Sequence, residues 1–254
     1  MAKYDYRKPM KEPSAVALHR DPWVQRPQVP YILPYVVFIL VMAPASFGNL
    51  GGIDWTRVWK NYLPWEYTLK SALAALLLWY FWPWYTRIQW RRIDLSIVAG
   101  FFGTVLWIAT EYACQKIHLA APPNAADINN PDLMLPVDWQ RWLFLCIRVA
   151  GPALVVPFME ELFFRDFIMR SLVGGTDFLD VPIGTFTWPS FLVMAALFGI
   201  NHGFNYFIPG LLYGFLMGLL LIRTKSLGAC IIAHGITNWT LYLYCIYTGD
   251  WQFM

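Results

Sequence analysis

The feature that most constrains this chain is a succession of apolar segments that begins at Tyr31 and continues to the C-terminus. A hydrocarbon core about 30 Å thick is crossed by a helix of about 20 predominantly apolar residues. Segments of that kind recur here, with short polar or proline-containing joints between them. The composition agrees, since 58% of the 254 residues are hydrophobic and only 14% are charged. We therefore expect an all-α integral membrane protein, a polytopic bundle of transmembrane helices in a lipid bilayer.

Seven spans are predicted from the positions of the apolar runs. They cover residues 31–48, 64–85, 95–112, 140–172, 187–203, 207–222 and 227–248. The fourth is too long for one straight crossing, and Pro152 and Pro157 interrupt it. That interruption predicts either one kinked helix or two pieces, so a bundle of eight spans is the alternative.

Basic residues predict the orientation, because lysine and arginine favour the cytoplasmic side of a membrane. Residues 1–30 carry six of them and lack an apolar signal-peptide core, so we expect a cytoplasmic N-terminal tail. Further basic residues follow the second, fourth and sixth spans, at Arg87, Arg170 and Arg223. This pattern favours a bacterial inner membrane with the N-terminus in the cytoplasm. The net charge of +3 gives no reason to expect nucleic acid as a partner.

Ionisable residues inside the spans are candidates for function, because placing one in lipid is costly unless it is paired or hydrated. The densest group lies in FMEELFFRDF, residues 158–167. At about 100° per residue, Glu161 and Arg165 share one helix face and are expected to form a structural ion pair. Glu160 points about 100° away from Glu161 and has no basic partner within its own turn. Glu160 is therefore expected to face a cavity and act as a general base.

Two of the four histidines lie in the predicted spans. His202 ends FGINH at 198–202, and His234 begins HGITN at 234–238. The i,i+4 spacing puts His234 and Asn238 on one helix face, where both could donate hydrogen bonds to an oxyanion. A bridge between helices would explain either histidine alone. Two histidines together with two carboxylates favour a catalytic site.

The segments EELFFR, FGINH and HGITN resemble, in order, the EExxxR, FxxxH and HxxxN motifs of the CPBP family. These intramembrane proteases include the Rce1-type CAAX prenyl endopeptidases and bacteriocin-processing Abi proteins. The resemblance covers roughly residues 150–245. It divides the chain into the tail at 1–30, three spans and an outer loop at 31–139, and a CPBP-like catalytic core at 140–254. Asp166 departs from the family, many members of which have a small residue after the arginine.

The resemblance implies a helical bundle with a polar, water-filled intramembrane cavity. It also implies hydrolysis of a peptide bond in a membrane-bound or lipidated, CAAX-like protein or peptide. Glu160 and His202 would activate the water, while His234 and Asn238 would bind the oxyanion of the tetrahedral intermediate. The remaining carboxylate and arginine of the first motif would be the supporting pair.

Zinc is an alternative to a metal-free mechanism, because Glu160, His202 and His234 are also the ligand types of a catalytic zinc site. The family has been described both as metalloproteases and as glutamate proteases. The chain has no HExxH segment, and Asn238 is a better oxyanion donor than zinc ligand. A glutamate mechanism without a cofactor is therefore favoured.

Two other classes of function are compatible with a polar cluster in a membrane bundle. One is a non-catalytic immunity or scaffold protein of the same fold that uses the cluster to bind a partner. The other is a proton-coupled transporter, which is disfavoured because we find no internal repeat and no paired broken helices.

Small residues recur at every fourth position along the sixth span, at Gly210, Gly214 and Gly218. Such a stripe lets a neighbouring helix approach closely. We expect it to pack inside the bundle and to hold the spans that bear His202 and His234 in register.

Overall fold

The apolar segments of the sequence fold into helices, which confirms the all-α class. The computed structural model describes residues 26–41, 49–50, 53–122, 130–135 and 137–253, with the backbone alone at 49–50 and 53–64. The helices are α3 (Val29–Leu40), α4 (Trp55–Phe81), α5 (Ile93–Lys116), α6 (Pro131–Met134), α7 (Asp138–Ala150), α8 (Val156–Glu160), α9 (Met169–Gly174), α10 (Trp188–Asn201), α11 (Phe207–Thr224) and α12 (Leu227–Thr248). Short 3-10 turns occur at Trp82–Trp84, Gly175–Asp180 and Trp251–Phe253. The strands β1 (Asn49–Leu50) and β2 (Ile53–Asp54) form one antiparallel pair.

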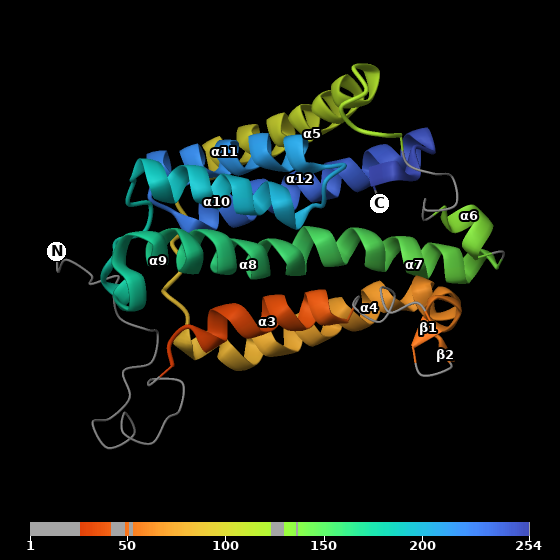
Figure 1. Cartoon of the computed structure of the whole chain (residues 1–254), viewed down its shortest axis with the longest axis horizontal. Coiled ribbons are helices and arrows are strands. Elements are labelled where there is room, and N and C mark those ends of the chain that lie inside the picture. The colour runs from red at the N-terminus through yellow and green to blue at the C-terminus, as the bar shows by residue number, and fades with distance from the viewer. Residues whose placement is uncertain (1–25, 42–48, 51–52, 123–129, 136, 254) are drawn as a thin grey trace.

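The bundle has three layers, with a long central helix in the middle (Figure 1). The central helix is formed by α7, α8, α9 and the turns between them. The pair α3 and α4 covers one side of it, and α10, α11, α12 and α5 lie on the other. A hydrophobic core fills each side, one around Phe164, Phe198 and Met217 and the other around Tyr31 and Met159. The middle of the central helix is therefore enclosed on both sides.

Four segments in the described part of the chain are long and apolar enough to cross a membrane. They are Ile93–Lys116, Asp138–Asp180, Phe207–Thr224 and Leu227–Thr248. The first predicted span is shorter than expected where it is described, since α3 ends at Leu40, and 42–48 lie outside the described residues. The second begins nine residues earlier than predicted, at Trp55. The tail predicted at 1–30 lies outside the described residues up to position 25.

The fourth predicted span is one continuous helical segment and not two pieces. Its hydrogen bonds change to the wider π pattern at Gly151–Val155 and again at Glu161–Ile168. A proline within a helix has no N–H to donate, and a π turn is one way for the chain to continue past the missing bond. Glu160 is the last residue before the second π stretch. The two carboxylates therefore stand at a change of helical geometry, a feature frequent at functional sites.

The glycine stripe packs against α10, as predicted. A Cβ atom on Gly214 would lie 2.9 Å from the Cα atom of Ala195, and one on Gly210 would lie 3.0 Å from the Cα atom of Gly199. Both contacts are with backbone, which cannot move aside without shifting the helix. The stripe therefore fixes the position of α10, whose C-cap residue is His202.

Candidate active site

A polar cavity of about 290 Å³ lies where the central helix, α10, α11 and α12 meet. Its wall includes all four residues predicted to be catalytic, Glu160, His202, His234 and Asn238. They come from three different helices, so the fold brings together residues that are distant in sequence. The predicted supporting pair stands behind this wall and does not line the cavity. The catalytic roles themselves stay predictions at this point.

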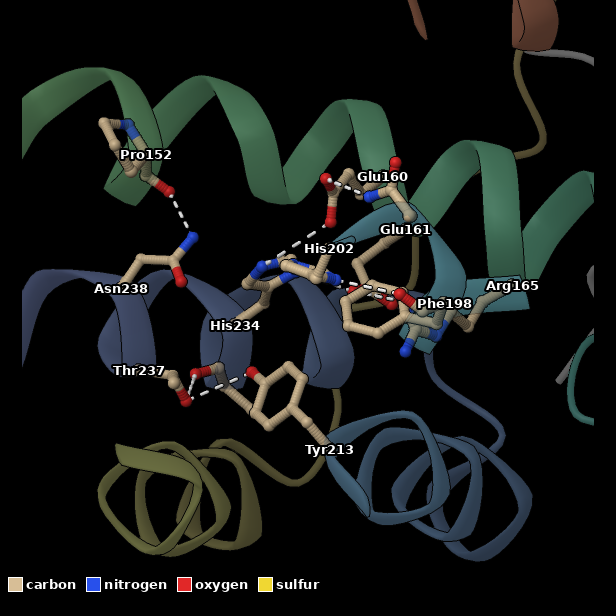
Figure 2. Close-up of polar contacts among 12 residues, drawn as sticks. Pro152, Glu160, Glu161, Arg165, Phe198, His202, Tyr213, His234, Thr237 and Asn238 are labelled. Atoms are coloured by element: carbon tan, nitrogen blue, oxygen red, sulfur yellow. Dashed lines mark hydrogen bonds and ion pairs between the residues drawn. The ribbon is translucent and has the colours of Figure 1, made fainter. Parts of the chain in front are cut away.

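The two carboxylate oxygens of Glu160 differ in their hydrogen bonding among the described residues. Its side chain is buried, and Oε1 accepts a hydrogen bond from Nδ2 of Asn201 at 3.3 Å. Oε2 has no hydrogen-bond partner among the described residues and lies 3.9 Å from Nε2 of His234 (Figure 2). That distance is too long for a direct hydrogen bond, yet one water molecule can contact both atoms. Oε2 is therefore the oxygen of Glu160 able to act on a bound water.

A single carboxylate oxygen of Glu161 contacts both Arg165 and His234. Nη1 of Arg165 donates to Oε1 of Glu161 at 3.1 Å, which confirms the predicted i,i+4 contact. Nδ1 of His234 lies 2.8 Å from the same oxygen, so Figure 2 shows His234 between the two glutamates. The guanidinium of Arg165 also stands over the ring of Phe198 at 4.2 Å, a favourable cation–π distance. The pair is fully buried and ties the central helix to α10 and α12.

His202 is oriented by a bond to the preceding turn. Its Nδ1 lies 2.8 Å from the carbonyl oxygen of Phe198, and a carbonyl can only accept. Nδ1 therefore carries the hydrogen, and Nε2 of the neutral ring keeps its lone pair. The ring of Trp107 packs edge-on against the imidazole, with centroids 4.9 Å apart. Phe198 thus contacts two residues of the site: its ring packs against the guanidinium of Arg165, and its carbonyl oxygen accepts a hydrogen bond from His202.

Asn238 already uses one of its amide hydrogens. Its Nδ2 donates to the carbonyl oxygen of Pro152 at 2.9 Å (Figure 2). In a π turn that carbonyl would bond to the residue five positions on, which is Pro157 and has no N–H. Beside it, a Cβ atom on Gly235 would lie 2.7 Å from the carbonyl oxygen of Ala153. Asn238 and Gly235 therefore dock α12 onto the irregular turn, and one amide hydrogen of Asn238 remains for another acceptor.

Asp166 does not join the network of Arg165. It forms an ion pair with Arg170, and Thr86 donates to it at 3.3 Å. Arg170 also donates to the carbonyl oxygens of Val181 and Leu179, each at 2.7 Å. Arg170 was expected to mark the cytoplasmic end of the fourth span, but its side chain is buried within α9. This second pair lies away from the cavity and holds the end of the central helix.

Several neutral residues of the site were missed by the sequence reasoning, which searched for ionisable groups. Tyr213 lines the cavity, and its hydroxyl donates to Thr237 at 3.1 Å. Thr237 donates in turn to the carbonyl oxygen of Gly100 at 2.8 Å, which fastens α12 to α5. Asn201 precedes a motif histidine and has no charge, so nothing in the sequence marked its contact with Glu160.

The described residues do not form a ready metal centre. No three His, Cys, Asp or Glu side chains in that part of the chain are grouped so that they could hold a metal ion. Glu160, His202 and His234 carry atoms of the kind that zinc binds and line the same cavity. Zinc therefore stays an alternative to the mechanism without a cofactor.

Most of the cavity wall lies in a segment that one protein family model matches. A family model described as type II CAAX prenyl endopeptidase Rce1-like matches residues 141–240. Residues 141–240 form an Rce1-like domain. The resemblance given by the three motifs is thereby confirmed, and this integral membrane protein carries a domain of a CAAX protease family. No curated protein and no solved structure matches the chain.

The Rce1-like domain includes most of the cavity wall but not all of it. It contains the central helix from position 141, α10, α11 and α12 as far as position 240. Phe38 of α3, Tyr67 of α4 and Trp107 of α5 line the cavity from outside the matched segment, as do four residues that follow it, Leu241, Tyr242, Gln252 and Phe253. The N-terminal helices are therefore part of the site and not only a membrane anchor.

Proposed function

We propose that this protein is an intramembrane endopeptidase that hydrolyses a peptide bond in a membrane-bound or lipidated, CAAX-like protein or peptide. The observation that carries the proposal is the meeting of Glu160, His202, His234 and Asn238 on one buried cavity inside an Rce1-like domain. Each brings a group that peptide hydrolysis needs, namely a free carboxylate oxygen, two imidazoles and a carboxamide.

Glu160 and His202 activate the water in this mechanism. Oε2 of Glu160 takes a proton from the water, while Nε2 of His202 holds the water by accepting its second hydrogen. The water oxygen then bonds to the carbonyl carbon of the scissile peptide, and the carbonyl electrons move to its oxygen. When the carbonyl re-forms, the carbon–nitrogen bond breaks and the proton on Glu160 passes to the departing amine. No oxidant, reductant or metal enters the balance.

His234 and Asn238 bind the oxyanion. His234 offers Nε2–H to the oxyanion in this mechanism, while its Nδ1 keeps its contact with Glu161. Asn238 supplies the amide hydrogen that Pro152 does not use. Loss of a single donor of this kind costs about 100- to 1,000-fold in kcat in a well-studied protease.

A second cavity supports the proposal that the substrate has an apolar segment. It lies on the other side of the contact between α12 and the central helix. This cavity of about 740 Å³ is lined almost entirely by apolar side chains, among them Trp90, Trp142 and Trp239. Ala153 and Gly235 line it, and their neighbours Pro152 and His234 line the polar cavity. A lipid chain or transmembrane segment of the substrate would thus lie next to the bond that is cleaved.

We also propose a bacterial inner membrane with the N-terminus in the cytoplasm, supported by the basic tail and the basic joint after α4. Reporter fusions at the N-terminus and after α4 test this orientation. At both positions, a reporter that works only in the cytoplasm should give a signal, and a reporter that works only in the periplasm should give none. A signal at the N-terminus from the periplasmic reporter would contradict the proposed orientation.

The test of the activity uses the purified chain in detergent and an internally quenched, farnesylated Cys-a-a-X peptide. Wild type should cleave it, and Glu160→Ala and His202→Ala should each abolish cleavage while melting as folded proteins. Cleavage at the wild-type rate by folded Glu160→Ala would overturn the proposed role of Glu160. Absence of cleavage by folded wild type, with prenylated and unprenylated peptides alike, would favour a non-catalytic immunity or scaffold protein. If wild type cleaves only an unprenylated membrane peptide, the activity stands and the lipidated substrate class is wrong.

A further inference from the structure

Two neutral residues form a hydrogen-bonded path that ends on Glu160. The hydroxyl of Tyr35 donates to Oδ1 of Asn201, and Nδ2 of Asn201 donates to Oε1 of Glu160 at 3.3 Å. Tyr35 belongs to α3 and Asn201 is the last residue of α10. The path therefore links the N-terminal layer, the far layer and the central helix at one carboxylate.

The direction of the path is fixed by its two ends. An ionised carboxylate can only accept, so it requires an N–H from Asn201. With Nδ2 directed to Glu160, the amide oxygen faces Tyr35, whose hydroxyl can donate. The reverse amide orientation would place two oxygens against each other at Glu160 and would leave the hydroxyl without its acceptor. Tyr35 thus selects the amide orientation that Glu160 needs.

Tyr35 is itself held by the central helix. Its ring stacks on Phe163, with centroids 4.0 Å apart and planes 6° apart, and meets Phe164 edge-on at 5.4 Å. These contacts fix the hydroxyl independently of its hydrogen bond. A Tyr35→Phe change would keep the ring in place and remove only the hydroxyl.

We infer that Tyr35 and Asn201 are positioning residues for the catalytic carboxylate. They hold Oε1 of Glu160 and so leave Oε2, which has no hydrogen-bond partner among the described residues, for the water. The inference rests on the proposed function, since it assumes that Glu160 is the base. It adds that α3, which lies outside the Rce1-like domain, completes the catalytic group.

The first test measures kcat and KM for the farnesylated Cys-a-a-X peptide. Asn201→Ala should lower kcat roughly 10- to 100-fold with KM unchanged, because a misplaced catalytic group can cost about 100-fold in rate. Tyr35→Phe should lower kcat by about 3- to 10-fold, the size of one lost hydrogen bond. Tyr85→Phe is the matched control, because its buried hydroxyl also bonds to α3, at the carbonyl oxygen of Pro30, and no hydrogen bond among the described residues connects it to Glu160. That variant should keep the wild-type kcat.

A second readout needs no substrate. The infrared difference between wild type and Glu160→Gln isolates the carboxylate bands of that one residue. Those bands should shift in Asn201→Ala and in Tyr35→Phe, and should be unchanged in Tyr85→Phe. If Asn201→Ala and Tyr35→Phe both kept the wild-type kcat and unshifted carboxylate bands, the inference would be overturned, even with Glu160→Gln inactive. An active Glu160→Gln enzyme would instead overturn the proposed role of Glu160 as the base, and an inactive wild type would overturn the proposed function, so these failures are distinguishable from that of the inference.

Discussion

The ion pair between Asp166 and Arg170 predicts an asymmetric loss of stability. Arg170 has three further acceptors, namely Thr86 and the carbonyl oxygens of Leu179 and Val181. Asp166 has only Thr86 besides the arginine, and its Oδ2 has no partner among the described residues. Removing the arginine therefore strands a carboxylate, whereas removing the carboxylate leaves a guanidinium that is still hydrogen-bonded.

The size of the loss follows from burial. Both side chains are buried, and breaking a buried pair by removing one partner costs about 3–5 kcal/mol. We expect Asp166→Ala at the lower end, about 3 kcal/mol, and Arg170→Ala at the upper end, about 5 kcal/mol. At about 2–4 °C per kcal/mol for a chain of this size, the melting temperatures should fall by roughly 6–12 °C and 10–20 °C.

The assay is thermal unfolding of purified protein in a mild detergent, followed by tryptophan fluorescence, with peptide cleavage measured below both melting temperatures. Neither residue lines the cavity, so the kcat of folded protein should stay at the wild-type value. The order of the two variants is the decisive result. If Asp166→Ala were less stable than Arg170→Ala, or if either lowered kcat without lowering the melting temperature, the pair would not act as the structural contact described above.

Three further outcomes are expected. Arg165→Ala should cost about 3–5 kcal/mol in unfolding experiments because it strands buried Glu161, and Glu161→Ala should also destabilise, since it strands Arg165; melting temperatures equal to wild type would contradict this. Gly214→Leu should reduce both the folded fraction and the cleavage rate because its side chain would meet the backbone at Ala195, whereas exposed Leu219→Val on the same helix should change neither; a fully active Gly214→Leu would contradict the packing. Exhaustive chelation should leave cleavage unchanged and mass spectrometry should find no stoichiometric metal, while loss of activity with rescue by zinc would show that the metal-free mechanism is wrong.

Periodicity alone predicted the part of the site that lies along single helices. The contact of Glu161 with Arg165 and the shared face of His234 and Asn238 follow from the angle between successive helical residues, and both are present. Asp166 and Arg170 have the same i,i+4 spacing, which also predicts an ion pair. The sequence analysis used Arg170 only as an indicator of membrane orientation at the end of the fourth span and did not pair it with Asp166.

Contacts between helices could not be predicted in this way. The bond of His234 to Glu161 and that of Asn201 to Glu160 depend on how α10 and α12 approach the central helix, and no local pattern fixes that approach. The prolines in the central helix did mark an irregularity. They do not say whether the chain breaks or continues through π turns, because that depends on a partner such as Asn238 for the freed carbonyl.

The most direct test of the central claim, that Glu160 performs proteolysis in the membrane, compares protein termini in the membrane proteomes of cells that produce different variants at equal levels. Glu111→Gln is the matched control, because Glu111 is a buried carboxylate in α5 that does not line the cavity. New termini should appear with wild type and with Glu111→Gln and be absent with Glu160→Gln. The same termini in cells with Glu160→Gln would contradict the account.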